Sequence, residues 1–304
     1  MRPAAAAVAV TGLALGGCRP DLGDPASLVT EPRILAVRSE PAEVAPDQPV
    51  AYRALIADPL GDGAPDIAWA FCTDPAPLSS NNVVNDGCIT DAAALPGSGL
   101  DVQAKIPLGA CSVFGPTPPA PLPGQPPRRP HDADITGGYY QPVRALATLA
   151  GAALSPGIGL TRITCDLANA PFDVVVAFRA RYRSNTNPTL AGVVALDRPD
   201  LARLPARTEV ALRASWTADS AELFPVFDPE SRTLVDHREA MRVSWFASGG
   251  TLASERTGRG EAETESFADN VWRTPDGGQA YLWVVLRDSR GGVAFAGYKI
   301  TIAP

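Results

Sequence analysis

Residues 209–216 read EVALRASW, and this stretch decides the fold class of the C-terminal part of the chain. Apolar side chains occupy every second position, at Val210, Leu212, Ala214 and Trp216. Because neighbouring side chains of a β-strand point to opposite faces of a sheet, a period of two predicts a strand with one buried face.

The same alternation returns further along the chain. MRVSWFA (241–247) places Trp245 on one face with Met241 and Val243, and YLWVVLRDSRGG (281–292) alternates similarly before a glycine turn. A final apolar stretch, VAFAGYKITIA (293–303), predicts a closing strand. We therefore expect a mainly β fold with a sandwich over residues 205–304. Trp245 should pack between its sheets against Leu282, Val284 and Leu286, and Trp283 should face outward.

Upstream, short apolar segments separated by proline, glycine and aspartate predict a second sandwich over residues 33–200. RILAVRSEP (33–41), QPVAYRALIADP (48–59) and DIAWAFC (66–72) are its first strands. One face of the second strand should carry Val50, Tyr52, Ala54 and Ile56. Trp69, on the third strand, is large enough to fill the centre of a two-sheet core.

The middle of this module is less regular. Half of the residues in GPTPPAPLPGQPPRRP (115–130) are proline, which predicts a surface loop with polyproline II character; a docking motif for a proline-recognising partner is the alternative. GYYQPVRALATL (138–149) and GLTRITCDL (159–167) predict strands. Residues 169–188 predict a short helix with Asn169 as N-cap and Pro171 in its first turn, although Val174 to Val176 favour a strand.

Four of the five cysteines lie in this first module, namely Cys72, Cys88, Cys111 and Cys165. An even number in an exported chain predicts disulfides, and three pairings are open. We favour Cys72 with Cys88, which closes a short turn-rich loop, and Cys111 with Cys165, which closes the long segment between them. The spacing lacks the C-x-x-C pattern typical of zinc sites.

The fifth cysteine, Cys18, ends an uncharged apolar N-terminal stretch that predicts a signal peptide over residues 1–17. The stretch is shorter than the roughly 20 apolar residues needed to span a bilayer. Residues 15–18, LGGC, resemble the lipobox of bacterial lipoproteins, in which the cysteine is acylated. The resemblance implies lipidation at Cys18, with residues 18–32 as a tether. Arg19, rather than an aspartate, follows the cysteine and favours the outer membrane.

Charge excludes one class of partner. The chain carries a net charge of −7, and its basic residues are almost all arginine, with lysine only at 105 and 299. Nucleic-acid binding requires a concentrated positive patch, and the sequence shows no basic run of that kind. We therefore expect no nucleic-acid partner.

Residues 205–303 resemble immunoglobulin-like and PKD-like modules of bacterial surface proteins, through VSWFASGGTL (243–252) and GGQAYLWVVLRDSRGGVAF (277–295). The first module, through AEVAPDQPVAYRALIADPLGD (42–62), GGYYQP and NTNPTL, is similar to the N-terminal module of uncharacterised lipoproteins of GC-rich Gram-negative bacteria. Both resemblances imply fold and location, and neither brings a catalytic residue.

The motifs of common enzymes are missing or incomplete. Ser98 in PGSGL lacks the spacing of a nucleophile elbow, and the two histidines, His131 and His237, are far apart in sequence. Asp58, Asp62 and Asp66 offer oxygen ligands but not the spacing of a calcium loop.

We therefore expect no catalytic residue, no cofactor and no metal ion. The predicted protein is a lipid-anchored envelope module for binding, adhesion or structure, with an envelope protein or a polysaccharide as partner. The alternative is an envelope hydrolase that uses carboxylates or a metal in the first module.

Overall fold

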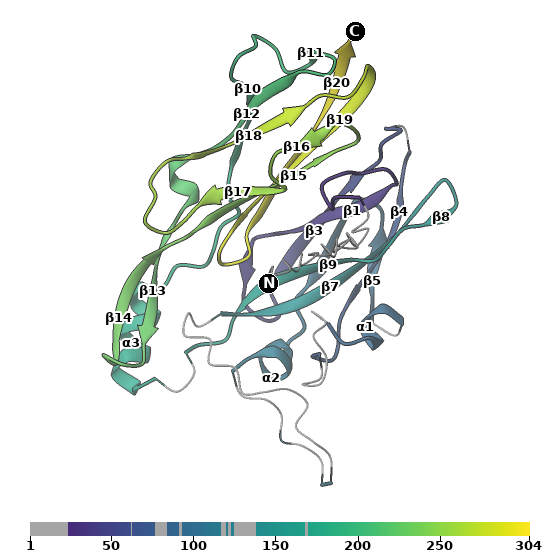
Figure 1. The fold of residues 1–304 in the computed structure, drawn as a ribbon. Coiled ribbons are helices and arrows are strands. Elements are labelled where there is room, and N and C mark those ends of the chain that lie inside the picture. Colours follow the sequence, from purple (N-terminus) through teal and green to yellow (C-terminus); the bar gives the residue numbers. More distant parts are fainter. Residues whose placement is uncertain are drawn as a thin grey trace, which may run out of the picture.

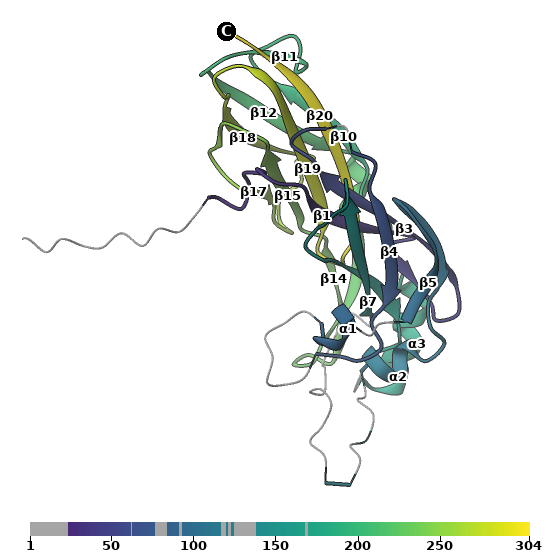
Figure 2. The ribbon, with the colours of Figure 1, turned by 90° about the vertical axis from the view of Figure 1, so that its right-hand side faces the viewer.

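The computed structural model describes residues 24–61, 63–76, 84–90, 93–116, 120, 123–124, 138–167 and 170–304. Within these ranges the chain is mainly β and forms two sandwiches that follow one another along a common long axis (Figure 1, Figure 2). The predicted fold class is confirmed. Among the described residues, no helix has the length and apolar character needed to cross a membrane.

The first module packs a three-stranded sheet against a larger one. The small sheet has the order β1 (Arg33–Glu40), β3 (Pro49–Ala57), β6 (Asp101–Lys105). The large sheet has the order β2 (Glu43–Val44), β9 (Gly157–Thr164), β7 (Gly138–Leu149), β4 (Asp66–Phe71), β5 (Ala93–Ser98), and β8 (Ala152–Ala153) pairs with β7. The strands predicted from the apolar segments are therefore present.

The second module packs a four-stranded sheet against a five-stranded one. The first has the order β10 (Leu190–Ala195), β12 (Glu209–Trp216), β18 (Phe267–Arg273), β16 (Thr251–Leu252). The second has the order β11 (Arg203–Pro205), β20 (Val293–Ala303), β19 (Gly278–Asp288), β15 (Met241–Ala247), β17 (Arg256–Arg259).

The two modules share one feature of strand pairing. In each, an early short strand pairs in parallel with the last strand, β2 with β9 in the first module and β11 with β20 in the second. The other pairings within both sandwiches are antiparallel. In each module the chain crosses several times between two facing sheets, which is the architecture of immunoglobulin-like sandwiches.

Tryptophans occupy the centre of both cores. Trp69 is almost fully buried, stacks on Tyr52 and donates from Nε1 to the carbonyl oxygen of Gly99 at 2.8 Å. In the second module Trp245 is fully buried and donates to Oγ1 of Thr257 at 2.8 Å. Each indole therefore fills apolar space while its one polar atom stays paired. The alternation predicted for residues 209–216 is confirmed, because Val210, Leu212, Ala214 and Trp216 all join this core.

Helices are few and short: α1 (Gly87–Thr90), α2 (Ala110–Phe114), α3 (Phe172–Arg181) and a 3₁₀ turn, η1 (Ala218–Ser220). The predicted helix is α3, but it begins two residues later than expected, with Pro171 at the N-cap rather than in the first turn. Proline at the cap fits, since that position needs no backbone N–H. Asn169, the predicted N-cap, lies outside the described residues.

Two features of the second module differ from the prediction. Residues 190–195, assigned from sequence to the first module, form β10 and pair with β12 of the second, so the second sandwich begins earlier than residue 205. In addition, a hairpin of β13 (Leu223–Asp228) and β14 (Thr233–Arg238) is inserted between β12 and β15. It reaches back to α3, where Phe227 packs with Phe178 and Tyr182 (Figure 1).

Candidate functional site

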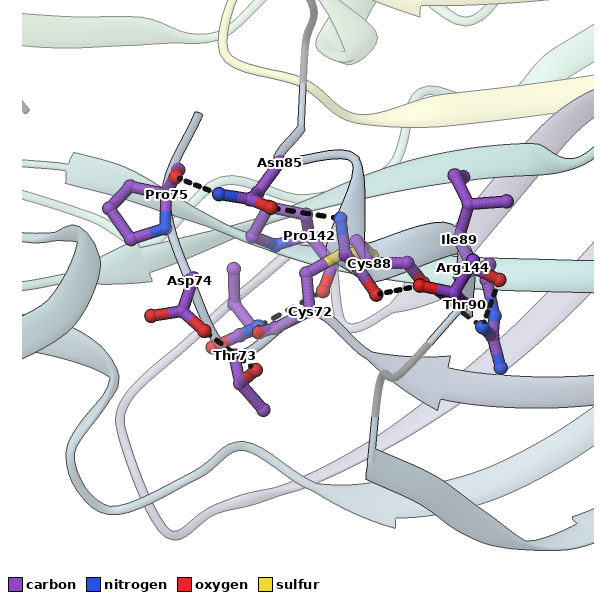
Figure 3. Close-up of a disulfide and its surroundings, with 12 residues drawn as sticks. Cys72, Thr73, Asp74, Pro75, Asn85, Cys88, Ile89, Thr90, Pro142 and Arg144 are labelled. Atoms are coloured by element: carbon purple, nitrogen blue, oxygen red, sulfur yellow. Dashed lines mark hydrogen bonds between the residues drawn. A yellow bond between two sulfur atoms is a disulfide. The ribbon is translucent and has the colours of Figure 1, made fainter. Parts of the chain in front are cut away.

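The four cysteines of the first module form two disulfides, with the pairing favoured from sequence. Cys72, directly after β4, is bonded to Cys88 on α1 (Figure 3). Arg144 on β7 donates from Nη1 to the carbonyl oxygens of Cys88 at 3.0 Å and Ile89 at 2.6 Å. The disulfide and this buried arginine together hold the short helix against the sheet.

The second disulfide joins Cys111 on α2 to Cys165, just past β9, across a sequence separation of 54 residues. Neither disulfide links the two sheets through the core, as the disulfide of antibody domains does. Both instead fasten peripheral segments to the large sheet, so their role is structural.

Other residues singled out from sequence do not converge. Asp58 accepts hydrogen bonds from the backbone N–H groups of Leu60 and Gly63 and thereby orders its own loop. Nδ1 of His237 lies 2.9 Å from Oε2 of Glu261, at the exposed hairpin. Within the described ranges, no group of three or more His, Cys, Asp and Glu residues could hold a metal ion. Ser98 lies exposed at the end of β5.

Several predictions fall on residues outside the described ranges. These are the signal peptide, the lipidation site Cys18, Arg19, Asp62 and His131. Most of the proline-rich stretch 115–130 is outside as well. They remain predictions.

The most distinctive feature of the molecule is the joint between the two modules, and its first part is apolar. The outer face of β19 and β15 packs against β1 and β3 of the first module. Trp283 does lie on the outer face of its sheet, as predicted, yet it is only 5% exposed. The first module covers it through Leu55 and Ala57, and Val285 beside it packs on Ala36. The face expected to meet solvent is therefore an interface.

The segment before β1 also belongs to this joint. Leu28 forms a parallel bridge with Ala247, and backbone hydrogen bonds join Val29 N to Ala247 O at 2.8 Å and Ala247 N to Ser27 O at 2.9 Å. Val29 is fully buried in the cluster around Trp283. Residues 18–32 were predicted to be a tether, but residues 27–29 lie fixed against the body because Val29 fills the seam.

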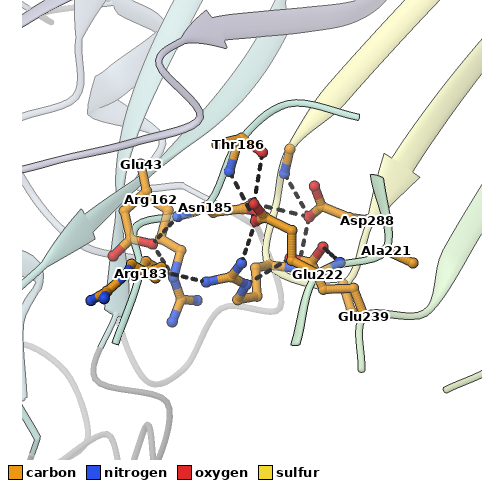
Figure 4. A network of polar contacts seen from close by, with 12 residues as sticks. Glu43, Arg162, Arg183, Asn185, Thr186, Ala221, Glu222, Glu239 and Asp288 are labelled. Carbon is orange, nitrogen blue, oxygen red and sulfur yellow. Dashed lines mark hydrogen bonds and ion pairs between the residues drawn. The ribbon is translucent and has the colours of Figure 1, made fainter. Parts of the chain in front are cut away.

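A buried polar network forms the second part of the joint (Figure 4). On the side of the first module, the carboxylate of Glu43 is fully enclosed. It accepts hydrogen bonds from the Tyr182 hydroxyl at 2.6 Å and from Asn185 N at 2.9 Å, and it lies 3.3 Å from Nε of Arg162. Glu43 thus ties β2 and β9 to the linker that leaves α3.

On the side of the second module, the network centres on Arg290, in the turn between β19 and β20. Its guanidinium forms ion pairs with Glu239 and Glu222, each at 2.6 Å, and donates to the carbonyl oxygen of Arg183 at 3.0 Å. Gly291 adopts φ of 101°, a conformation that favours glycine. A Cβ at Gly292 would lie 2.0 Å from Oδ2 of Asp288. These two glycines allow the turn to carry Arg290 into the joint.

The linker itself connects both sides. Asn185 donates from Nδ2 to Oδ1 of Asp288 at 3.1 Å. Asn187 donates from Nδ2 to the carbonyl oxygen of Ser39 at 2.6 Å and accepts from Val293 N at 2.8 Å. Both asparagines come from the NTNPTL stretch, which therefore connects the two modules through hydrogen bonds.

Burial perturbs the titration of this network. Burial, aided by the charge of Asp288, raises the pKa of Glu239 to about 7, although the Arg290 guanidinium opposes that rise. Burial also raises the pKa of Asp288. Three carboxyl groups, Glu222, Glu239 and Asp288, surround one arginine, so a proton retained near neutral pH relieves their mutual repulsion.

The network can fix an orientation, but it offers nothing to an external substrate. Glu43, Glu239, Arg162 and Arg290 are buried, and their polar groups are engaged by one another. A catalytic group must reach a substrate, whereas an enclosed and paired network holds elements in register. The sequence prediction missed this site. Its only signals were isolated charged residues inside apolar strand segments, Glu43 in AEVAP and Arg162 in GLTRIT.

No protein-family model matches the chain, and no curated protein matches it. Among solved structures, it is similar to fibronectin(III)-like modules of Clostridium thermocellum CbhA, with 9% identity over 88% of this chain and 94% of that chain and a TM-score of 0.23. The adhesin InvE of Yersinia pseudotuberculosis is similar with 8% identity over 88% and 58% of the two chains and a TM-score of 0.25.

A lipoprotein from Bacteroides thetaiotaomicron is similar with 15% identity over 37% of this chain and 79% of that chain, and a TM-score of 0.24. The immunoglobulin-like architecture follows from the strand order of the two modules described above.

Proposed function

We propose that the protein is a membrane-anchored cell-envelope lipoprotein whose two sandwiches act together as one binding, adhesion or structural unit. The observation that carries this proposal is the joint. Apolar packing around Trp283, a docked N-terminal segment and a buried ionic network all connect the modules. Modules that only succeed one another on a flexible linker need none of these contacts.

A fixed pair of sandwiches suits presentation rather than catalysis. Loops at the ends of such sandwiches are the usual recognition surfaces, and a stiff scaffold holds them at a defined separation. The carboxylates that gather in the described part of the chain, Glu222, Glu239 and Asp288, serve the joint. We propose no catalytic role for them. The ligand belongs to the class of envelope proteins or polysaccharides.

Anchoring at Cys18 completes the proposal. Pro25 follows Cys18 by seven positions, and an extended chain of that length spans at most about 25 Å. Because residues 27–29 are docked at the joint between the modules, a lipid on Cys18 would hold this joint close to the bilayer. Two or three acyl chains suffice for stable membrane attachment. We assign the outer membrane because Arg19 follows the lipidated residue.

The test is metabolic labelling with palmitate, followed by membrane fractionation. The Cys18→Ala variant should lose the label and leave the membrane fraction. A matched control, the double variant Cys72→Ala/Cys88→Ala, removes cysteines elsewhere and should keep both the label and the membrane location. If Cys18→Ala is still labelled and still sediments with membranes, the anchoring proposal is wrong.

A further inference from the structure

Three arginines gather in a groove beside the joint. Arg242, Arg256 and Arg287 together line two adjoining hollows of about 700 Å³ and about 330 Å³. They come from three neighbouring strands, β15, β17 and β19. In a chain with a net charge of −7, this local gathering of one positive residue type stands out.

The register places these like charges next to each other. Arg242 lies directly opposite Arg287 on the paired strand, and Arg256 is opposite Ser244, diagonal to Arg242. Directly opposed side chains have Cβ atoms roughly 5 Å apart, and like charges at that separation are destabilising. Burial and the charges of Arg256 and Arg242 lower the pKa of Arg287. An anion between the three side chains would remove this repulsion.

The protein supplies little to neutralise them. In the described part of the chain, none of the three guanidinium groups forms an ion pair. Arg287 donates only to the carbonyl oxygen of Leu35, at 3.4 Å. Two carboxyl groups line the hollows without pairing with these arginines. Oε1 of Glu255 accepts from Ser27 N at 3.3 Å, and Oδ1 of Asp288 accepts from Asn185 and from the backbone N–H groups of Arg290 and Gly292. Arg259, at the far end of the larger hollow, is by contrast paired with Glu263 and Glu265.

The groove lies where the N-terminal segment meets the body. Ala26 and Ser27 line its smaller hollow, together with Leu35 of the first module. Cys18 is eight residues before Ala26, so a lipid on Cys18 would hold this rim within about 30 Å of the bilayer. Among the ligands that the three arginines could bind, the one nearest to them is the headgroup layer itself.

We propose that this arginine groove binds the phosphate groups of anionic lipid headgroups in the membrane that holds Cys18. The proposal rests on the lipid anchor proposed above. Arginine is suited to the task, because its planar fork donates two parallel hydrogen bonds to phosphate oxygens. Acyl chains and arginine groove would then act as two attachments, and the body would lie against the membrane in one orientation instead of swinging on its tether.

The test measures binding of a chain that begins at residue 19 to vesicles. This chain keeps every described residue and carries no acyl group, so its result is independent of palmitate labelling at Cys18. It should sediment with vesicles of phosphatidylcholine mixed with phosphatidylglycerol and stay in solution with phosphatidylcholine alone. Salt should weaken the binding.

The decisive variant is Arg242→Gln/Arg256→Gln, which changes two exposed residues and leaves the packed Arg287 in place. It should bind the anionic vesicles roughly thirtyfold more weakly, as expected for two basic residues at an anionic surface. The control is Arg207→Gln/Arg213→Gln, with the same change in net charge but at arginines paired with Asp276 and Asp269. It should bind like the unchanged chain.

Four results would overturn the proposal. One is equal binding by the two double variants, and another is equal binding to neutral and anionic vesicles. The third is binding of inorganic phosphate at constant ionic strength by a chain that does not bind the anionic vesicles, since the groove would then take a free phosphate. Binding of an acidic polysaccharide without binding to vesicles would likewise assign the groove to a different partner.

Discussion

At the scale of single residues, Trp283 shows that the contribution of a side chain to stability depends on what packs on its face of the sheet. Its indole lies in the seam with Val29 and Ala57 and stacks on Tyr281. Period-two alternation correctly puts Trp283 and Trp245 on opposite faces, but alternation carries no information about what covers the outer face. Only the packing of the first module makes that face an interior.

Replacing Trp283 with alanine therefore tests the seam. In the whole chain the change should cost about 3 to 5 kcal/mol, the range for deleting a large buried aromatic side chain. In a fragment of residues 186–304, where Trp283 faces water, the cost should be roughly 1 kcal/mol or less. Urea unfolding of both gives the two values. Trp245→Ala is the control and should cost about 3 to 5 kcal/mol in the whole chain and in the fragment. If Trp283→Ala costs the same in the whole chain and in the fragment, the first module does not stabilise Trp283.

Glu239 makes stability depend on pH in a defined direction. Its pKa is raised from the ordinary 4.5 to about 7, so folding takes up a proton in this interval. The free energy of unfolding should therefore fall as the pH rises from about 4.5 to 7, because the unfolded chain releases that proton first. Exposed carboxyls whose pKa values are lowered by paired arginines, such as Asp101 and Asp269, act at lower pH and with the opposite sign.

The measurement is urea unfolding at pH 5 and pH 7 for the unchanged chain and for Glu239→Gln. Glutamine cannot ionise, so the variant should lose most of the decline between these two pH values. The groups facing residue 239 are Arg290, Asp288 and the backbone of Glu222, and all remain in the variant. An unchanged decline in the variant would show that another group titrates.

At the scale of elements, the strands could be read from sequence because each carries its pattern within about ten residues. GYYQPVRALATL, predicted as a strand, is β7 from its first residue to its last. The early residues of the second module were misassigned for a different reason. LAGVVA, at 190–195, looks like any apolar strand, and only its hydrogen bonds to β12 place it in the second sandwich.

The disulfides should stabilise the first module in proportion to the loops they close. The chain-entropy relation gives about 4 kcal/mol for the 54-residue separation of Cys111 and Cys165 and about 3 kcal/mol for the 16-residue separation of Cys72 and Cys88. Thermal unfolding of the two double-alanine variants should rank them in that order. The reverse order would mean that local contacts, such as those of Arg144, outweigh loop entropy.

The inserted hairpin is a further element that sequence patterns did not reveal. Phe227 of β13 packs on Phe178 and Tyr182, so the second module supports α3 of the first. Phe227→Ala should therefore speed amide hydrogen exchange in residues 172–181 by at least tenfold and leave the strands of the first module unchanged. Leu223→Ala, at an exposed position on the same strand, is the matched control. Unchanged exchange in α3 would show that the helix is stable without the hairpin.

At the scale of the whole molecule, the two sandwiches could be predicted and the joint between them could not. A sandwich core arises from patterns that repeat along each strand. The joint instead unites Glu43, Tyr182 and Arg290, which are separated by more than a hundred residues and share no local pattern. Charged side chains in a sequence normally indicate a solvated face, and only the assembled fold shows these to be enclosed and paired.

The central claim is that this joint holds the two modules in one orientation, and distances between spin labels test it most directly. The inter-module distance is measured between spin labels on Gln103→Cys in the first module and Glu209→Cys in the second, in a chain that also carries Cys18→Ser. Both labelled positions are exposed. A second pair of labels, at Glu209 and Gln279 within the second module, gives the width of the distance distribution expected for a rigid unit. We predict a single inter-module distance distribution as narrow as the one within the module. A broad or two-peaked inter-module distribution would contradict the account.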